Sequence, residues 1–96
     1  MQFMVTTPLN LEQAKTPLPK DLANAEFEAV RGLYMSGLIR QIWVHADGSG
    51  AVMLAEADSA EDAATKFAAL PLVREGILKT PEIVALAPYF GFAPRG

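Results

Sequence analysis

Residues 38–57, LIRQIWVHADGSGAVMLAEA, decide the fold because they predict two strands joined by a tight turn. The first strand is expected from Leu38 to Ala46, which is rich in the aliphatic, β-branched and aromatic residues typical of strands. Asp47-Gly48-Ser49-Gly50 predicts a hairpin turn, since Asp and Gly readily adopt positive φ. Residues 51–57 then form the return strand, which gives an antiparallel hairpin in the middle of the chain.

A helix is predicted before this hairpin, from Pro19 to Ser36. Proline suits the first helical turn, and Gly37 suits the position just past the end. At about 100° per residue, the apolar side chains fall on one broad arc: Leu22, Ala23, Ala25, Phe27, Ala29, Val30, Leu33 and Tyr34. The polar side chains fall opposite: Lys20, Asp21, Asn24, Glu28 and Arg31. This pattern indicates an amphipathic helix that lies on a core.

A second helix is predicted after the hairpin. Ser59 is its N-cap, Asp62 completes a capping-box pattern, and Leu70-Pro71 ends it. Its buried stripe consists of small residues and one aromatic: Ala60, Ala63, Ala64, Phe67 and Ala68. Residues 72–80 are ambiguous and allow one short helical turn around residues 72–76.

Two further strands are expected near the ends of the chain. Residues 2–6 form the first and Pro8 ends it, a loop covers residues 7–18, and residues 81–87 form the last strand. The resulting order β-α-β-β-α-β is the split βαβ arrangement of the ferredoxin-like α+β fold, with both helices on one face of an antiparallel sheet. The length predicts a single domain, residues 1–96.

The uncovered sheet face predicts a homo-oligomer, a dimer or larger. Residues of the apolar class make up 51% of the chain and cysteine is absent, so the small core is stabilised by packing, by association, or by both. The tail, residues 88–96, carries Tyr89, Phe90 and Phe92 and is expected at a subunit interface.

Composition narrows the function classes. The net charge of −3 and the lack of a basic run argue against nucleic acid. No apolar run approaches the roughly 20 residues needed to span a bilayer, and no signal peptide is seen, so we expect no membrane contact and a cytoplasmic protein. One histidine and no cysteine argue against a metal site, and no phosphate loop or nucleophile arrangement is present. No cofactor is expected, which leaves proton transfer or binding of a small molecule without chemistry.

Glu26 is the strongest candidate catalytic residue. It falls near the middle of the apolar arc of the first helix, where a carboxylate costs several kcal/mol unless it is paired, hydrated or protonated. Apolar surroundings raise a carboxyl pKa, which suits a general base that works near neutral pH. The alternative is a structural ion pair with Arg40 or Lys66.

The second strand supplies candidate substrate-binding residues: Arg40, Gln41 and Trp43, to which Tyr34 of the helix is added. Strict alternation places Ile39, Gln41, Trp43 and His45 on one side and Leu38, Arg40, Ile42 and Val44 on the other. Arg40 and Gln41 therefore cannot both point at Glu26, and which side lines a pocket stays open. His45 is expected to be exposed or to cap the turn.

Residues 24–75 resemble the muconolactone isomerase family, small cofactor-free enzymes of aromatic catabolism in the dimeric α+β barrel superfamily. The matching positions are Glu26, Gly37, Arg40-Gln41-Ile42-Trp43, Asp58-Ser59 and Leu70-Pro71-Leu72. The resemblance implies a ferredoxin-like fold, assembly into oligomers, and a proton shift that moves the double bond of a lactone. It also implies that Glu26 is the helix glutamate of the family and that Gln41 lies where members carry His or Gln.

Two segments depart from the family pattern. Residues 50–54 are smaller and wholly apolar, and residues 88–92 end the chain differently, so a substrate other than muconolactone itself is expected. Three functions are compatible with these residues: an isomerase based on Glu26, a non-catalytic binding or assembly module, and a cofactor-free oxygenase that uses the aromatic residues Trp43 and Tyr34.

Overall fold

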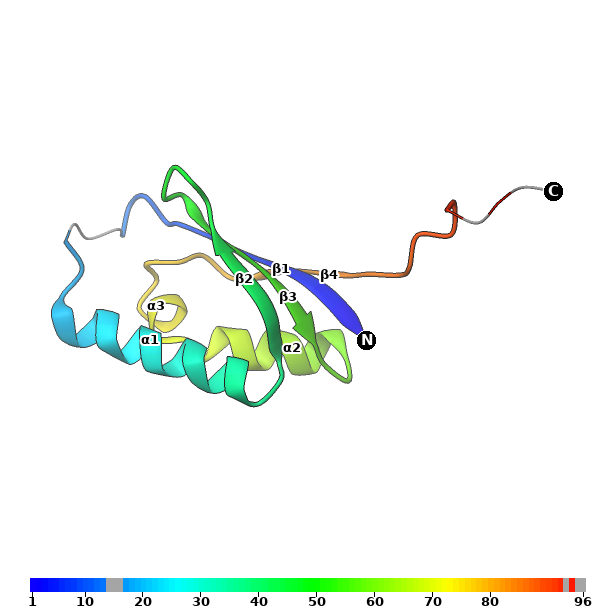
Figure 1. The fold of residues 1–96 in the computed structure, drawn as a ribbon. Coiled ribbons are helices and arrows are strands. Elements are labelled where there is room, and N and C mark those ends of the chain that lie inside the picture. The colour runs from blue at the N-terminus through cyan, green and yellow to red at the C-terminus, as the bar shows by residue number, and fades with distance from the viewer. Residues whose placement is uncertain (14–16, 93, 95–96) are drawn as a thin grey trace.

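The computed structural model describes residues 1–13, 17–92 and 94. Within them a four-stranded antiparallel sheet of order β2-β3-β1-β4 is covered by helices on one face (Figure 1). The elements are β1 (Gln2–Pro8), α1 (Lys20–Met35), β2 (Ile39–Val44), β3 (Gly50–Glu56), α2 (Ala60–Ala68), α3 (Pro71–Arg74) and β4 (Glu82–Ala85). The predicted ferredoxin-like α+β fold is confirmed.

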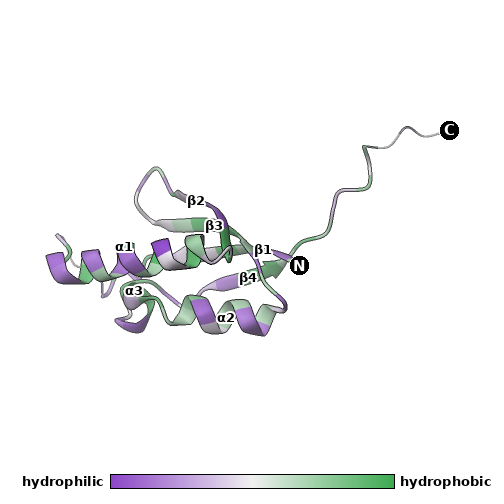
Figure 2. Cartoon of the chain, turned by 60° about the horizontal axis from the view of Figure 1, so that its bottom comes forward, coloured by the Kyte–Doolittle hydropathy of each residue, from purple (hydrophilic) through white to green (hydrophobic). Residues whose placement is uncertain are grey.

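The core lies between the sheet and the helices (Figure 2). Alternate residues of β1, namely Phe3, Val5 and Thr7, are buried on the side of the helices. Phe67 of α2 is fully buried in the same layer. Complete burial of one such apolar side chain contributes about 1.5–3 kcal/mol, so each of these residues is a substantial source of stability.

The ends of the helices follow the predicted signals. α1 begins directly after Pro19 and ends before Gly37, whose φ of 88° continues the chain out of the helix. At the start of α2 the Ser59 hydroxyl accepts a hydrogen bond of 3.0 Å from the Asp62 N–H. The ambiguous region after Leu70-Pro71 forms the four-residue helix α3.

The strands at the ends of the chain differ slightly from the prediction. β1 continues through Pro8, because Thr7 pairs with Ala51 and Pro8 pairs with Gly50. The following loop therefore begins later than expected. β4 covers only four residues of the predicted 81–87. Residues 14–16 of the predicted loop and 93, 95 and 96 of the predicted tail lie outside the described residues.

The strict alternation predicted for the second strand is wrong, because β2 contains a bulge. Ile39 lies opposite Ala55, but Gln41 lies opposite Leu54, so Arg40 is an extra residue in the strand. An extra residue reverses the side to which the following residues point. Ile39 therefore points to the core, although Gln41, two positions later, does not.

Beyond the bulge, Ile42 and Val44 lie opposite Met53 and Ala51 and share the helix side of the sheet. Gln41 and Trp43 lie on the outer side. The outer face also carries Met4, Thr6, Val52, Leu54 and Val84, and within the described residues no helix covers it.

Residues 86–92 project from the body of the domain as an extended tail (Figure 1). Its three aromatic side chains are exposed: Tyr89, Phe90 and Phe92. In the described part of the chain, no helix has the length and apolar character required to cross a membrane.

Gly50 is the most demanding position of the hairpin. Its φ is 149°, and a Cβ built there would lie 2.5 Å from the carbonyl oxygen of Thr7. Gly48 also has a positive φ, of 77°, but a Cβ there meets no atom within 4 Å. We therefore expect Gly48→Ala to lower the free energy of unfolding by about 1 kcal/mol, through strain alone.

We expect Gly50→Ala to lower the free energy of unfolding by at least about 2 kcal/mol, since β1 and β3 must also move apart. Urea unfolding at one fixed protein concentration measures both values. Equal losses for the two variants would contradict the close approach at Gly50.

Candidate functional site

Glu26 is the one residue of α1 that is buried, with 9% of its surface exposed. The helical wheel placed it at the centre of the apolar arc, and the structure places it against α3. Its Oε1 accepts a hydrogen bond of 3.0 Å from the backbone N–H of Leu72. This contact joins α1 to α3 across 46 residues of sequence.

The surroundings of Glu26 favour its protonated form. Burial raises the pKa of the Glu26 carboxyl above its ordinary value, and the hydrogen bond from Leu72 offsets part of that rise. No cation is paired with it in the described residues. The Arg40 Nε instead donates to the Gly37 carbonyl at 2.8 Å, and the Lys66 Nζ lies 3.4 Å from Asp62 Oδ2.

A cavity of about 420 Å³ opens at Glu26, between α1 and the helix side of β2 and β3. Its lining residues are Glu26, Phe27, Val30, Arg31, Tyr34, Ile42, Val44 and Ala51. The residues among them with polar side chains are Glu26, Arg31 and Tyr34. Cavities of this size, with apolar walls and few polar groups, are typical of small-molecule sites. We call it the Glu26 pocket.

The Glu26 pocket is open to solvent because it lies at the edge of the sheet, where β2 has no outer neighbour. Its walls are apolar and yet exposed to solvent. The exposed fraction of the residue surface is 68% for Phe27, 57% for Tyr34 and 77% for Val44. The helical wheel placed Phe27 and Tyr34 on the core side of α1. Instead they line the Glu26 pocket, since α1 extends along this free edge.

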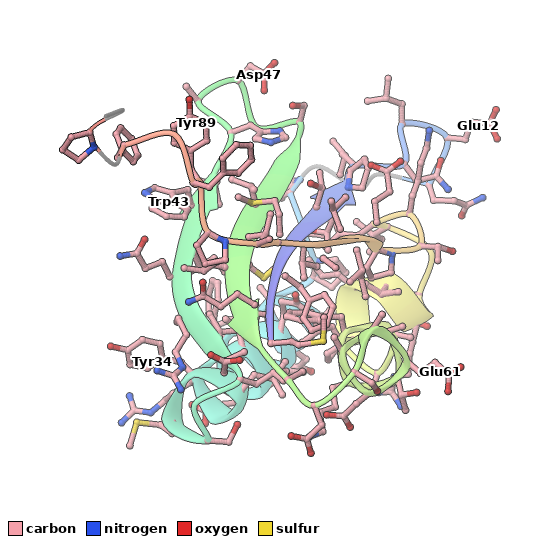
Figure 3. The ribbon with its side chains drawn as sticks, turned by 90° about the vertical axis from the view of Figure 1, so that its right-hand side faces the viewer. Glu12, Tyr34, Trp43, Asp47, Glu61 and Tyr89 are labelled. Carbon is pink, nitrogen blue, oxygen red and sulfur yellow. The ribbon has the colours of Figure 1, made fainter. Side chains whose placement is uncertain are left out.

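The structure brings together only two of the predicted site residues, Glu26 and Tyr34. Gln41 and Trp43 lie on the outer face of the sheet, and Arg40 lies in a polar surface depression with Glu56 and others. Figure 3 shows Tyr34 on α1 well separated from Trp43 on β2. Within one chain these three residues of β2 do not reach the Glu26 pocket.

Sequence reasoning missed three residues of this region. Arg31 falls on the polar side of the helical wheel, but it is among the residues that line the cavity. Phe27 was assigned to the core. Leu72 contributes a backbone N–H, which no sequence pattern could have identified.

His45 has a local role in the hairpin. Its Nδ1 lies 2.9 Å from the Ser49 hydroxyl, and the Ser49 N–H donates to Asp47 Oδ1 at 2.9 Å. Hydrogen bonding from the Ser49 side chain, and then from the Ser49 backbone, holds the pKa of the Asp47 carboxyl below its ordinary value. The three side chains bond to one another across the turn, so the shape of the turn accounts for them.

No protein-family model matches the sequence, and no curated protein matches it either. Solved structures do match. One is muconolactone isomerase, with a TM-score of 0.72 and 18% identity over 100% of this chain and 98% of that chain. This chain has the muconolactone isomerase fold.

A second match is 5-chloro-2-hydroxyhydroquinone dehydrochlorinase from Burkholderia phenoliruptrix AC1100, in complex with 2,5-dihydroxybenzoquinone. Its TM-score is also 0.72, with 14% identity over 91% of this chain and 94% of that chain. At these identities the likeness establishes the muconolactone isomerase fold and leaves the activity to be argued from the site.

The raised pKa of Glu26 makes stability depend on pH. Because the folded state holds this proton to a higher pH than the unfolded chain, the contribution of Glu26 is complete below the ordinary pKa of a glutamate. It is lost as pH rises through the raised pKa. Glu26→Gln keeps an oxygen that can accept from Leu72, so we expect it to be more stable than the wild type at pH 8 and to lose that advantage near pH 4.

Urea unfolding at the two pH values measures the effect, and Glu28→Gln, an exposed position on the same helix, is the matched control. Glu26→Ala leaves the Leu72 N–H without its acceptor and should be less stable than Glu26→Gln by about 1–3 kcal/mol. A Glu26→Gln variant with the same pH profile as Glu28→Gln would show that the carboxyl is not desolvated.

Proposed function

We propose that this protein is a cofactor-free isomerase-like enzyme that moves a proton within a small cyclic carbonyl compound, with Glu26 as the base. One observation carries the proposal. A buried carboxyl group with a raised pKa, whose partner within the described residues is a single backbone N–H, opens into an apolar cavity. A structural carboxylate would instead be expected to pair with a cation.

The two oxygens of Glu26 divide the work. The Leu72 N–H holds Oε1, which leaves Oε2 free to face a ligand. The ionised carboxylate takes a proton from a carbon next to the carbonyl, and the electron pair of the broken C–H bond moves to the carbonyl oxygen as an enolate. The same carboxyl returns the proton to another carbon of the conjugated system, so atoms and charge balance.

Stabilisation of the enolate falls to the polar groups that line the cavity. Arg40 and Gln41 were the expected donors, but they lie outside the Glu26 pocket. We assign this role to Tyr34 and Arg31, which are among the residues that line the pocket and which carry a hydroxyl donor and a positive charge. Donors that face the developing negative charge are the largest contribution in reactions of this kind.

The substrate class rests on the size of the cavity and on its walls. A volume of about 420 Å³ accepts one or two rings, and aromatic and aliphatic walls suit a flat, largely apolar ligand. The two structural neighbours are named for a lactone and for a chlorinated hydroquinone. Both are small oxygenated rings, which supports a ligand of this type here.

We expect the wild type to isomerise muconolactone or a substituted lactone, and Glu26→Gln to lose at least about 100-fold in kcat, as is typical when a general base is removed. Ultraviolet absorbance follows the moving double bond. Glu28→Gln should keep the wild-type rate.

No turnover of any lactone by the folded wild type would reject the isomerase. Calorimetric binding of the same lactones without turnover would then identify a non-catalytic binding module on this fold.

We further propose that the chain forms a homo-oligomer through the outer face of its sheet. The face is apolar and within the described residues uncovered, and Trp43 and Val84 on it are 51% and 58% exposed. Faces of this kind on small domains are typical of subunit interfaces.

We expect Trp43→Glu to convert the oligomer to monomers, because a charge in an apolar interface is left without a partner. Light scattering after gel filtration measures the mass. Thr65→Glu, on the exposed side of α2, adds the same charge and should leave the mass unchanged. An unchanged mass for both variants would place any subunit interface elsewhere.

A further inference from the structure

We propose that Gly76 is a positioning residue for the base: it turns the chain after α3 so that Leu72 is held in place and, through Leu72, the Glu26 carboxyl. The inference deepens the function proposed above and rests on Glu26 as its base, but its test has a readout that needs no turnover. Gly76 is not among the residues that line the Glu26 pocket. It acts on the base through two backbone contacts in series.

Leu72 is held at both of its backbone groups. Its carbonyl oxygen accepts hydrogen bonds from the N–H groups of Ile77 at 2.9 Å and of Leu78 at 3.1 Å. Its own N–H donates to Glu26 Oε1 at 3.0 Å. A donor whose residue is fixed in this way presents one direction to the carboxyl group, so the arrangement restricts where the Glu26 carboxyl lies.

The segment that supplies the two donors is anchored to the end of β1. The Asn10 N–H donates to the Ile77 carbonyl at 2.8 Å, and the Lys79 N–H donates to the Pro8 carbonyl, also at 2.8 Å. The Ile77 side chain is buried in addition. The sheet therefore fixes this segment, and the segment fixes Leu72.

Gly76 allows the segment to reach back to Leu72. Its φ is 75°, a left-handed conformation that glycine adopts without strain and alanine rarely does. α3 ends at Arg74, and the turn at Gly76 directs the next two N–H groups back at the helix. Among the described residues, a Cβ at this position would meet Gln13 Cγ at the ordinary contact distance of 3.9 Å. A side chain therefore fits there, and it is the backbone conformation that requires the glycine.

Replacement of this glycine is expected to release the Leu72 donor. Gly76→Ala relieves its strained backbone by a shift of the turn, which takes the Ile77 and Leu78 N–H groups away from the Leu72 carbonyl. Burial raises the pKa of the Glu26 carboxyl, and the hydrogen bond from Leu72 lowers it. A weaker hydrogen bond leaves the rise from burial less opposed, so the titration of Glu26 moves to higher pH.

The charged and titratable groups that face Glu26 come from two helices. Arg31 and Tyr34 of α1 line the pocket with it. Arg74 and Glu75 of α3 are exposed and line a surface depression between α3 and α1. The pocket residues that β2 and β3 contribute are uncharged: Ile42, Val44 and Ala51. Roughly 1 M salt shortens the Debye length to about 3 Å, so a titration at that salt concentration suppresses the contribution of the exposed charges.

Carbon NMR of glutamate labelled at the side-chain carboxyl follows the titration, and Glu26→Gln identifies the Glu26 signal by its loss. We expect Gly76→Ala to move the midpoint to higher pH. Gly76→Asn should keep the midpoint close to that of the wild type, because asparagine adopts the left-handed conformation more readily than alanine. Gly48→Ala is the matched control, with a φ of 77° and free space around its Cβ, and it should leave the midpoint unchanged.

The kinetic readout follows the same order. We expect Gly76→Ala to lower kcat about ten-fold and to leave KM within about two-fold, because a displaced base slows the proton transfer more than it weakens binding. The pH profile of kcat should move to higher pH together with the NMR midpoint. Gly76→Asn and Gly48→Ala should keep kcat within about two-fold of the wild type.

Three outcomes would overturn the inference. An unmoved Glu26 midpoint in Gly76→Ala would mean that the turn does not act on the base. An equal shift in Gly48→Ala would assign the effect to lost stability, and an equal shift in Gly76→Asn would assign it to the added side chain.

The titration separates this inference from the proposed function. A midpoint that moves as expected in a protein that turns over no lactone keeps the positioning role of Gly76 and rejects the isomerase. Lactone turnover with an unmoved midpoint rejects the positioning role and leaves Glu26 standing as the base.

Discussion

The hydrogen bond between the Leu72 N–H and Glu26 Oε1 is the interaction around which the site is arranged. A carboxylate on the buried side of a helix is costly, and one backbone donor offsets only part of that cost, which is why the pKa of Glu26 stays raised. The same contact fixes α3 against α1 and engages only one of the two carboxylate oxygens of Glu26. A position that weakens the fold in this way is expected to be retained for function rather than for stability.

The cavity itself follows from the edge of the sheet. β2 has no neighbour beyond it in the described residues, so α1 extends over a strand edge instead of over a further strand. Apolar residues that would be buried on a wider sheet, such as Phe27 and Tyr34, become the walls of an open pocket. The bulge at Arg40 completes the arrangement, because it turns Ile42 and Val44 toward this pocket and Trp43 away from it.

The sequence was sufficient for the elements with strong local signals. Pro19 and Gly37 delimit the first helix, Ser59 caps the second, and Asp47 to Gly50 can only form a turn, so these boundaries were predicted to within about a residue. Glu26 was found by the same local logic, as a charge on an apolar arc. The bulge could not be predicted, since it depends on pairing with β3 and has no residue signature in IRQIWV. One inserted residue was enough to move Gln41 and Trp43 to the outer face.

The open pocket connects the chemistry to the assembly. A proton taken from carbon returns to the same molecule only if bulk water is kept from the carboxyl group, and a single chain leaves the walls around Glu26 exposed. A domain of 96 residues has little material from which to build a lid of its own. In the proposed function, association with a second copy covers the apolar outer face of the sheet, and a flat ligand seated in the pocket covers the walls around Glu26 and keeps water from the base.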